Sequence, residues 1–295
     1  MPTSKTIRHK DLEFATEAVG EPGNTPILMI MGATASMMWW PDEMCSALAA
    51  AGRFVIRYDN RDTGQSTTGE PGDLDYSIDD MANDAFAILD GYGVDAANIV
   101  GMSLGAMIGQ LMALERPSRV LSLTAISSSR FDEDDPTLPE MDPSLLAHFG
   151  KMADLDWDDR EAVLSFHAET WRISAGAGSN FDMQAAHALA LREFDRARNP
   201  RSALNHSMLQ GGEKYRGQVG RITAPTLVIH GRHDPILSLA HGERLASAIP
   251  GARLVALDAG HELNPRDWPL IVSSIVEHTR PPRSGVAGEA APAPT

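Results

Sequence analysis

Short apolar runs alternate along this chain with longer amphipathic stretches. Runs such as 27–31 and 54–58 read as strands buried on both faces of a sheet. The amphipathic stretches between them have helical spacing and stop at glycine or proline, as they do after residues 78–89. Strands alternating with helices in this way predict an α/β fold with right-handed crossovers and a mostly parallel sheet. The eight predicted strands lie near 6–9, 13–19, 27–31, 54–58, 97–100, 120–127, 225–231 and 253–257, and the helices between them near 44–51, 78–89, 106–115, 240–248 and 269–278.

The alternation stops after residue 129, where no strand-like run appears until residue 225. Four helical stretches fill this gap, near 143–152, 159–171, 182–198 and 200–209. We therefore predict an α/β core made of residues 1–130 and 216–280, flanked by helices, with a helical cap inserted at 131–215. Residues 281–295 are rich in proline, alanine and glycine, and we expect them to form a disordered tail.

The junction between one predicted strand and its helix carries the motif Gly101-Met102-Ser103-Leu104-Gly105. Strand, Gly-x-Ser-x-Gly and helix in this order are typical of a nucleophile elbow. The turn is so tight that a side chain in place of Gly101 or Gly105 is expected to collide with a neighbouring element. Ser103 then stands exposed at a helix N-terminus, where developing negative charge is stabilised.

A serine hydroxyl needs a neighbouring base, and the base needs a carboxylate to orient it. Asp234 and His261 each follow a predicted strand, in the chain order serine, acid, histidine. Both are expected at the carboxyl edge of the sheet, where sites form in open α/β folds. We predict Ser103, Asp234 and His261 as the catalytic residues. Asp132, which follows the strand before the cap, is a weaker alternative for the acid.

Two backbone amides are needed to stabilise the negative charge on a reacting carbonyl oxygen. One is predicted to come from Leu104, the residue after the nucleophile. The other is expected from the loop after the third strand, from Ala33 or the adjacent Gly32. Because these donors belong to the backbone, the apolar side chain of Met31 in this loop does not prevent the function.

Aromatic and methionine side chains gather after the oxyanion loop and in the predicted cap. We expect them to line a pocket for a bulky apolar or aromatic substrate, although they would equally well pack the cap on the core. The candidates for substrate contact are Trp39, Trp40, Trp157, Phe166, Trp171 and Met208.

The sequence around Asp234 also has the spacing of a metal site, His230-x-x-His233-Asp234. The position of Asp234 after a strand is already explained by the acid of the triad. We therefore predict no metal and no cofactor. The single cysteine, Cys45, lies in an amphipathic helical stretch and is expected to pack in the core.

The net charge of −15 argues against nucleic acid and anionic membranes as partners. A lone cysteine excludes a disulfide within the chain and fits a reducing compartment. The first residues lack the apolar segment of a signal peptide, and no apolar run is long enough to span a bilayer. We expect a cytoplasmic protein without membrane partners, either a monomer or a homodimer.

Taken together, these residues resemble the α/β-hydrolase superfamily over roughly residues 6–279. The chain is similar in particular to methylesterases that act on anthracycline polyketides, of the aclacinomycin methylesterase type. The segments that carry this likeness are Met31-Gly32, where most relatives have His-Gly, residues 40–43, 55–64 and 89–95, and the cap run 171–173. The resemblance implies hydrolysis of a carboxylic ester on a polycyclic aromatic substrate, and it matches Ser103, Asp234 and His261 to the family triad.

We therefore predict a serine esterase that cleaves a small-molecule carboxylic ester through an acyl-enzyme. The same triad also serves cofactor-free perhydrolases of the haloperoxidase type and hydrolases of C–C bonds, and these remain alternatives. A more distant alternative is a ligand receptor that keeps the fold without catalysis. The intact triad argues against this last function.

Overall fold

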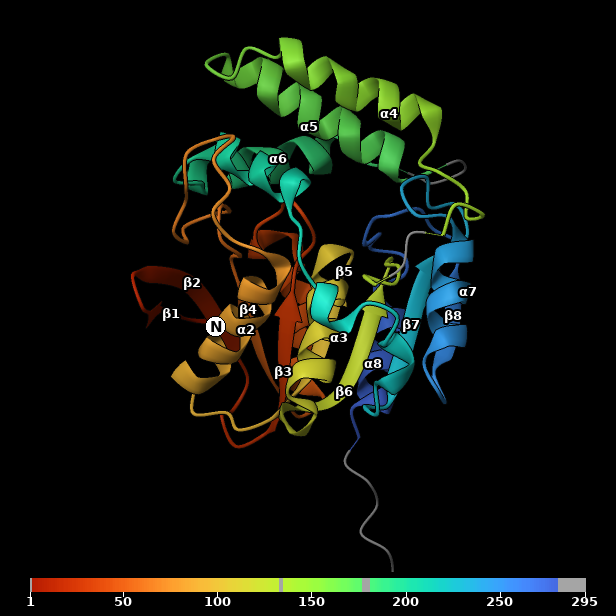
Figure 1. Cartoon of the computed structure of the whole chain (residues 1–295). Helices are drawn as coiled ribbons and strands as arrows, with labels where there is room; N and C mark the ends of the chain where they lie inside the picture. Colours follow the sequence, from red (N-terminus) through yellow and green to blue (C-terminus); the bar gives the residue numbers. More distant parts are fainter. Residues whose placement is uncertain (1, 133–134, 177–180, 281–295) are drawn as a thin grey trace, which may run out of the picture.

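An eight-stranded sheet forms the centre of the protein in the computed structural model (Figure 1). Its order is β1-β2-β4-β3-β5-β6-β7-β8; β1 and β2 are antiparallel to their neighbours, and every pair from β4 to β8 is parallel. The predicted α/β fold with a mostly parallel sheet is confirmed. The strands are β1 (Thr3–His9), β2 (Leu12–Val19), β3 (Thr25–Ile30), β4 (Arg53–Tyr58), β5 (Ala97–Met102), β6 (Val120–Ile126), β7 (Thr226–Gly231) and β8 (Arg253–Leu257).

The structure describes residues 2–132, 135–176 and 181–280. The predicted disordered tail, 281–295, lies outside the described residues. Within these described ranges, no helix combines the length and the apolar character that crossing a membrane requires.

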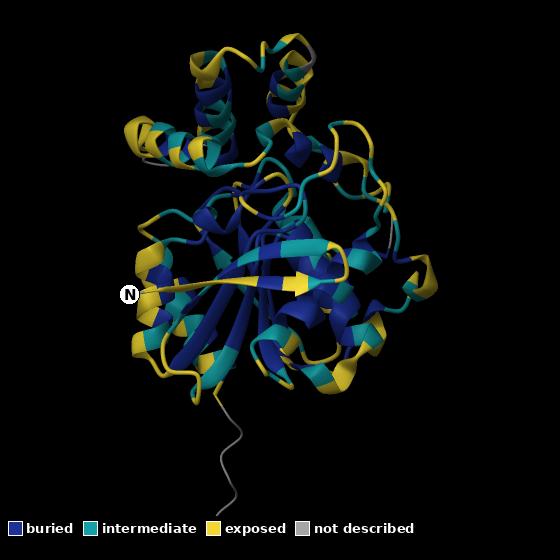
Figure 2. Ribbon diagram, turned by 90° about the vertical axis from the view of Figure 1, so that its left-hand side faces the viewer, coloured by how far each residue is buried: buried dark blue, intermediate teal, exposed yellow. Residues whose placement is uncertain are grey.

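Helices cover both faces of the sheet, which explains why its central strands are apolar throughout. Leu28 and Ile30 of β3 pack on the side of α2, α3 and α7, whereas Ile27 and Met29 pack on the side of α1 and α8. Figure 2 shows the buried central strands and the exposed edge strand β1. These helices are α1 (Asp42–Ala50), α2 (Ile78–Gly91), α3 (Leu104–Glu115), α7 (Leu239–Ala248) and α8 (Trp268–His278), and the short 3₁₀ turns η1 (Met37–Trp39) and η2 (Pro117–Arg119) lie in the connections.

We call the described residues between 131 and 215 the cap, after the range predicted from the sequence. Its α-helices lie over the end of the sheet at which β5 and β7 finish (Figure 1). Each begins at an aspartate whose carboxylate accepts a backbone N–H of the first turn: Asp142, Asp159 and Asp182. The elements between β6 and β7 are α4 (Pro143–Gly150), η3 (Lys151–Asp154), α5 (Arg160–Ser174), α6 (Met183–Arg196), η4 (Pro200–Met208), η5 (Glu213–Tyr215) and η6 (Val219–Arg221).

The predicted helix at 200–209 is a 3₁₀ helix, η4, and its contacts explain the tighter winding. A 3₁₀ helix places every third residue on the same side. Ser202 and Asn205 are both fully buried on the side that faces the core. The Ser202 hydroxyl donates to the Gly69 carbonyl at 2.6 Å, and the Asn205 amide donates to the Asp62 carboxylate at 3.0 Å.

Candidate active site

Ser103 occupies the sharp turn between β5 and α3, with φ of 50° and ψ of −119°. This left-handed region is rarely adopted by residues other than glycine. The two flanking glycines are required by close backbone contact: a Cβ on Gly101 would lie 2.3 Å from the Gly105 carbonyl oxygen, and one on Gly105 only 2.0 Å from that of Ile30. The local structure therefore has the geometry expected of a nucleophile elbow, with Ser103 partly exposed at its tip.

His261 and Asp234 lie together in the loops that follow β8 and β7. The Nδ1 atom of His261 lies 2.7 Å from Oδ2 of Asp234, and the other carboxylate oxygen accepts the amides of Ile236 and Leu237, both at 2.9 Å. Burial alone would raise the pKa of Asp234, but the neighbouring His261 lowers it overall. Asp234 is thus a carboxylate that orients the His261 ring.

Asp132, the alternative acid, is used elsewhere. Its carboxylate pairs with Arg130 at 2.9 Å and accepts the Val219 amide at 3.1 Å, which joins the start of the cap to η6. Of the two candidate acids, the structure brings Asp234 to His261.

His230, considered from the sequence only as a metal ligand, lies beside Asp234. Burial lowers its pKa, and its Nε2 donates to the Leu237 carbonyl at 2.7 Å while lying 3.5 Å from the Asp234 carboxylate. His233 points elsewhere, with its ring 2.8 Å from the Asp258 carboxylate near the surface. The spacing that suggested a metal site therefore does not bring these side chains to one point. The sequence did not predict that His230 contacts Asp234 and the Leu237 carbonyl, because its position in a strand does not show which loop packs against it.

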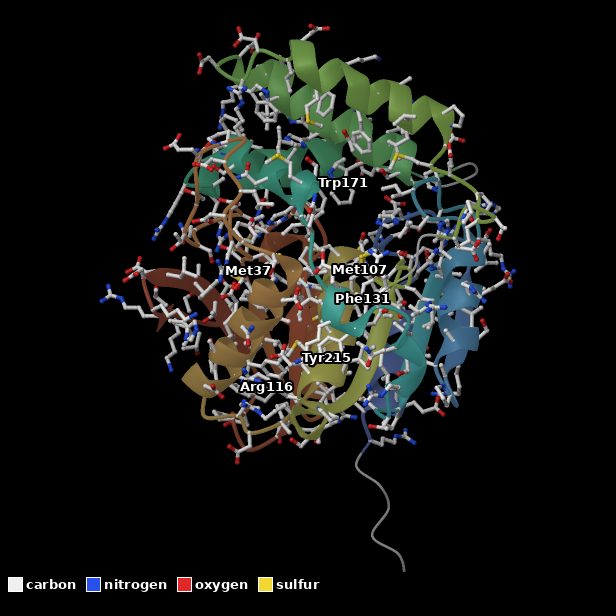
Figure 3. All side chains as sticks on the ribbon, viewed as in Figure 1. Met37, Met107, Arg116, Phe131, Trp171 and Tyr215 are labelled. Atoms are coloured by element: carbon white, nitrogen blue, oxygen red, sulfur yellow. The ribbon has the colours of Figure 1, made fainter. Side chains whose placement is uncertain are left out.

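Ser103 and His261 both line a cavity of about 610 Å³ between the core and the cap. One wall is aromatic: Trp39 of η1 and Trp171 of α5 stack with ring centroids 3.5 Å apart and planes 11° from parallel. Figure 3 shows Trp171 reaching from the cap into the space above the sheet. Four of the six candidates for substrate contact line this cavity: Trp39, Trp157, Phe166 and Trp171.

Trp40 and Met208 do not line the cavity, and their prediction as substrate contacts is corrected. Trp40, the residue after η1, is fully buried in the hydrophobic cluster that also holds residues of β3 and α1. Met208 ends η4 and is 40% exposed, while its neighbour Ser207 lines the cavity. Neighbouring residues of an irregular segment point in different directions, which composition alone does not reveal.

The predicted oxyanion residues lie beside Ser103. A Cβ built on Gly32 would come within 3.2 Å of the Ser103 Cβ and 3.9 Å of its Oγ, so the loop after β3 passes directly over the serine. Ala33 lines the cavity, and no hydrogen bond to its amide is present in the described ranges. Leu104 is the first residue of α3, where backbone amides have no acceptor within the helix.

Two titratable cap residues also line the cavity. Burial lowers the pKa of His167 to about 4, so its imidazole is neutral at physiological pH. Burial raises the pKa of Glu193 to about 7, and the negative charge of Asp59 acts in the same direction. At pH 7 the His167 ring is therefore neutral, and the Glu193 carboxyl is about half protonated.

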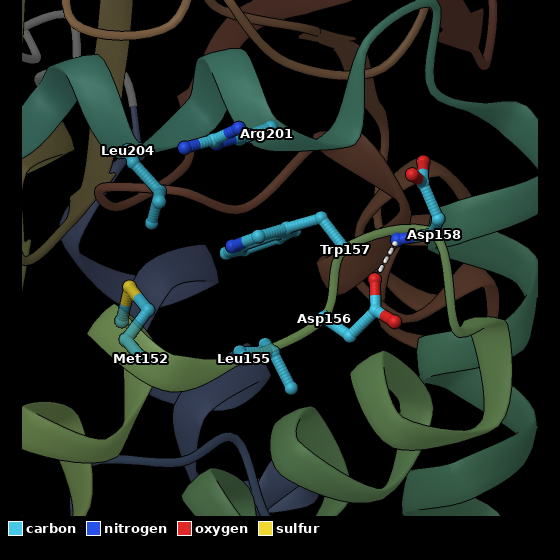
Figure 4. Close-up of a pocket in the computed structure, with 7 residues that line it drawn as sticks. All are labelled: Met152, Leu155, Asp156, Trp157, Asp158, Arg201 and Leu204. Carbon is cyan, nitrogen blue, oxygen red and sulfur yellow. Dashed lines mark hydrogen bonds between the residues drawn. The ribbon is translucent and has the colours of Figure 1, made fainter.

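A second, outer pocket of about 500 Å³ opens on the cap beside the main cavity (Figure 4). Trp157 belongs to both, as do Met152 and Leu204, so the indole ring stands between them. Beside it, the Asp158 amide donates to the Asp156 carboxylate at 3.0 Å. The outer pocket is lined by Met152, Leu155, Asp156, Trp157, Asp158, Arg201 and Leu204.

Comparison with known proteins agrees with this geometry. Residues 25–265 match the family model described as the alpha/beta hydrolase fold. The chain belongs to the α/β-hydrolase fold family. It is 35% identical to the rhodomycin D methylesterase DnrP of Streptomyces peucetius and 36% identical to DauP of Streptomyces sp. strain C5, each alignment covering 95% of this chain and 99% of the relative.

Solved structures agree on the fold of this α/β hydrolase. A 2-hydroxy-6-oxo-6-phenylhexa-2,4-dienoate hydrolase from Rhodococcus sp. strain RHA1 superposes with a TM-score of 0.76 at 22% identity, over 94% of this chain and 98% of the other. The family match and the identity to the two rhodomycin D methylesterases confirm the predicted membership of the superfamily and the likeness to methylesterases.

Proposed function

We propose that this α/β hydrolase is a serine esterase that removes a methyl ester from a bulky, polycyclic aromatic substrate. One observation carries the proposal: Ser103 and His261 line a cavity whose wall is formed by the stacked rings of Trp39 and Trp171. A cavity of about 610 Å³ suits a ligand of several fused rings. The methylesterase names of its relatives support the same reaction.

The first half of the reaction is acylation of Ser103. The bond to Asp234 places the proton of the neutral His261 ring on Nδ1, which leaves Nε2 as the base. His261 takes the hydroxyl proton as the Ser103 oxygen attacks the ester carbonyl. The tetrahedral intermediate then collapses, His261 returns the proton to the departing methoxide, and methanol leaves.

The negative charge of the intermediate rests on the former carbonyl oxygen. The amides of Ala33 and Leu104, with Gly32 beside them, are proposed to donate to it. Removing one such donor in a serine hydrolase typically costs a factor of about 10²–10³ in kcat.

The second half of the reaction is hydrolysis of the acyl-enzyme. A water gives its proton to His261 and attacks the acyl carbonyl, and the second intermediate releases the carboxylic acid. His261 returns the proton to Ser103. Water and ester are consumed and methanol and acid are formed, with no redox step.

The experiment is a methanol-release assay on two esters, methyl pyreneacetate and methyl acetate. We expect turnover of both and a much lower KM for the pyrene ester. Replacing Trp171 by alanine should raise the KM for the pyrene ester about tenfold, since an aromatic pair contributes roughly 0.5–1.5 kcal/mol beyond its buried area. The KM for methyl acetate should hardly change.

Leu146→Ala is the matched control, because this side chain lies on α4 of the same cap and is 61% exposed. It should leave both KM values unchanged. Absence of methanol release from both esters, together with peroxide-dependent bromination or cleavage of a C–C bond, would overturn the proposal in favour of one of the other reactions.

We propose a monomer or a homodimer, which sedimentation velocity distinguishes by mass. A cytoplasmic location is proposed from the single cysteine, Cys45, whose thiol is buried and whose pKa is raised to about 11 by that burial.

A further inference from the structure

The loop that passes over Ser103 contains a strained residue, and a cap residue binds it there. Thr34 has φ of 65°, a conformation that residues other than glycine keep only when their surroundings impose it. Its backbone amide donates to Nδ1 of His206 at 3.0 Å. His206 belongs to η4 and is only 5% exposed.

The bonds of His206 fix its protonation. Because Nδ1 accepts the Thr34 N–H, it carries no proton. The Nε2 atom therefore carries the proton and donates it to the Arg61 carbonyl at 2.8 Å. His206 thus joins the oxyanion loop on one side to the turn after β4 on the other. A neutral ring in this one tautomer is required for both bonds.

A second cap residue binds the same loop two residues further on. Glu193 of α6 accepts the Ser36 amide at 3.1 Å and the Ser36 hydroxyl at 2.5 Å. Core residues hold the flanks: the Asn60 amide donates to the Met31 carbonyl at 3.0 Å, and the Asp59 carboxylate accepts the Met37 amide at 2.9 Å.

The predicted oxyanion donor, the amide of Ala33, lies beside amides that these bonds hold in place. The amides of Thr34, Ser36 and Met37 all have acceptors, whereas the Ala33 amide has no acceptor within the described part of the chain and borders the cavity. Met31, with its apolar side chain, cannot brace the loop through a polar group. The polar support comes instead from cap residues more than 150 positions away along the chain.

We propose that the cap positions the oxyanion donor, with His206 as the principal positioning residue and Glu193 as its partner. The inference rests on the proposed function, since it assumes that the Ala33 amide meets the reacting oxygen. His206 does not line the cavity; it acts by fixing the Thr34 peptide and with it the direction of the preceding amide.

The test is a pair of substitutions that separate the two bonds of His206. In His206→Asn the amide oxygen is attached where Nδ1 was and can still accept the Thr34 N–H. In His206→Gln the terminal amide reaches the position of Nε2, towards Arg61, and the acceptor for Thr34 is lost. A side chain that only fills space should be replaced better by the larger glutamine.

We expect His206→Gln to lower kcat for methyl pyreneacetate about 10²-fold, with KM within about twofold of the wild type. His206→Asn should retain most of kcat. Equal kcat values in the two variants, or a higher value in the glutamine variant, would overturn the inference. Circular dichroism of both variants establishes that each is folded.

Ser36→Ala serves if a His206 variant does not fold. It removes the hydroxyl that donates to Glu193 and that also accepts the Met38 amide at 3.2 Å. It should lower kcat several-fold, and an unchanged kcat would contradict the inference. Failure of the proposed function is recognised separately, because it would leave Ser103→Ala active. If Ser103→Ala is inactive and His206→Gln keeps full activity, the role of the cap is refuted and the proposed function stands.

Discussion

Asp234 is held so firmly that its replacement by asparagine has a defined consequence. One of its oxygens accepts two backbone amides, and the other accepts the proton of His261 Nδ1. In Asp234→Asn, the amide oxygen should stay with the two backbone donors, which turns the NH₂ group towards His261. Nδ1 must then accept instead of donate, and the ring proton moves to Nε2.

We predict that Asp234→Asn lowers kcat about 10⁴-fold, because His261 Nε2 then cannot take the Ser103 proton. The KM should change little, since Asp234 does not line the cavity. Asp132→Asn is the matched comparison. It should keep kcat and reduce only the melting temperature, because Asp132 binds Arg130 and not His261. Similar losses in both variants would contradict the assignment of the acid.

At the scale of single elements, the contact between α6 and the loop after β3 makes the stability depend on pH. Burial raises the pKa of Glu193 to about 7 from an ordinary value of 4.5. The folded state therefore holds this proton more tightly than the unfolded state. The resulting stabilisation is fully present below pH 4.5 and is lost as the pH rises through about 7.

Glu193→Gln removes this titration. Between pH 5 and pH 8 the free energy of unfolding of the wild type should fall relative to the variant, by on the order of 3 kcal/mol. Urea unfolding of both proteins across this range measures the difference. Parallel pH dependences would show that Glu193 does not titrate in this way.

Elements formed by local pattern were predictable from the sequence, and those defined by distant contacts were not. The apolar run of β3 predicts a strand because both its faces are covered. The 3₁₀ winding of η4 depends on polar groups of the core that Ser202 and Asn205 reach. Likewise, no local pattern reveals that Trp39 lines the cavity whereas Trp40 is fully buried in the core.

At the scale of the whole molecule, the candidate site is assembled from the core and completed by the cap. Ser103, Asp234 and His261 were predictable because each follows a strand, and parallel strands bring such positions to one edge. His206 and Glu193 lie 172 and 157 residues from the loop residues they bind. No local signal marks them, because their role exists only once the cap has folded onto the core.

The cap also contacts the loop of His261, the proposed base. The backbone amide of His261 donates to the carbonyl of Ser174, the last residue of α5, at 2.8 Å. Gly260 allows this approach, since a Cβ there would lie 2.2 Å from the same carbonyl oxygen. The cap is therefore bound both to the loop over Ser103 and to the loop of His261.

The central claim is that Ser103 is the nucleophile of an ester hydrolase, and its most direct test is the rate of methanol release by Ser103→Ala. With methyl pyreneacetate as substrate, we predict a kcat at least about 10⁴-fold below that of the wild type, in a protein with an unchanged melting temperature. Turnover by Ser103→Ala at the rate of the wild type would contradict the account.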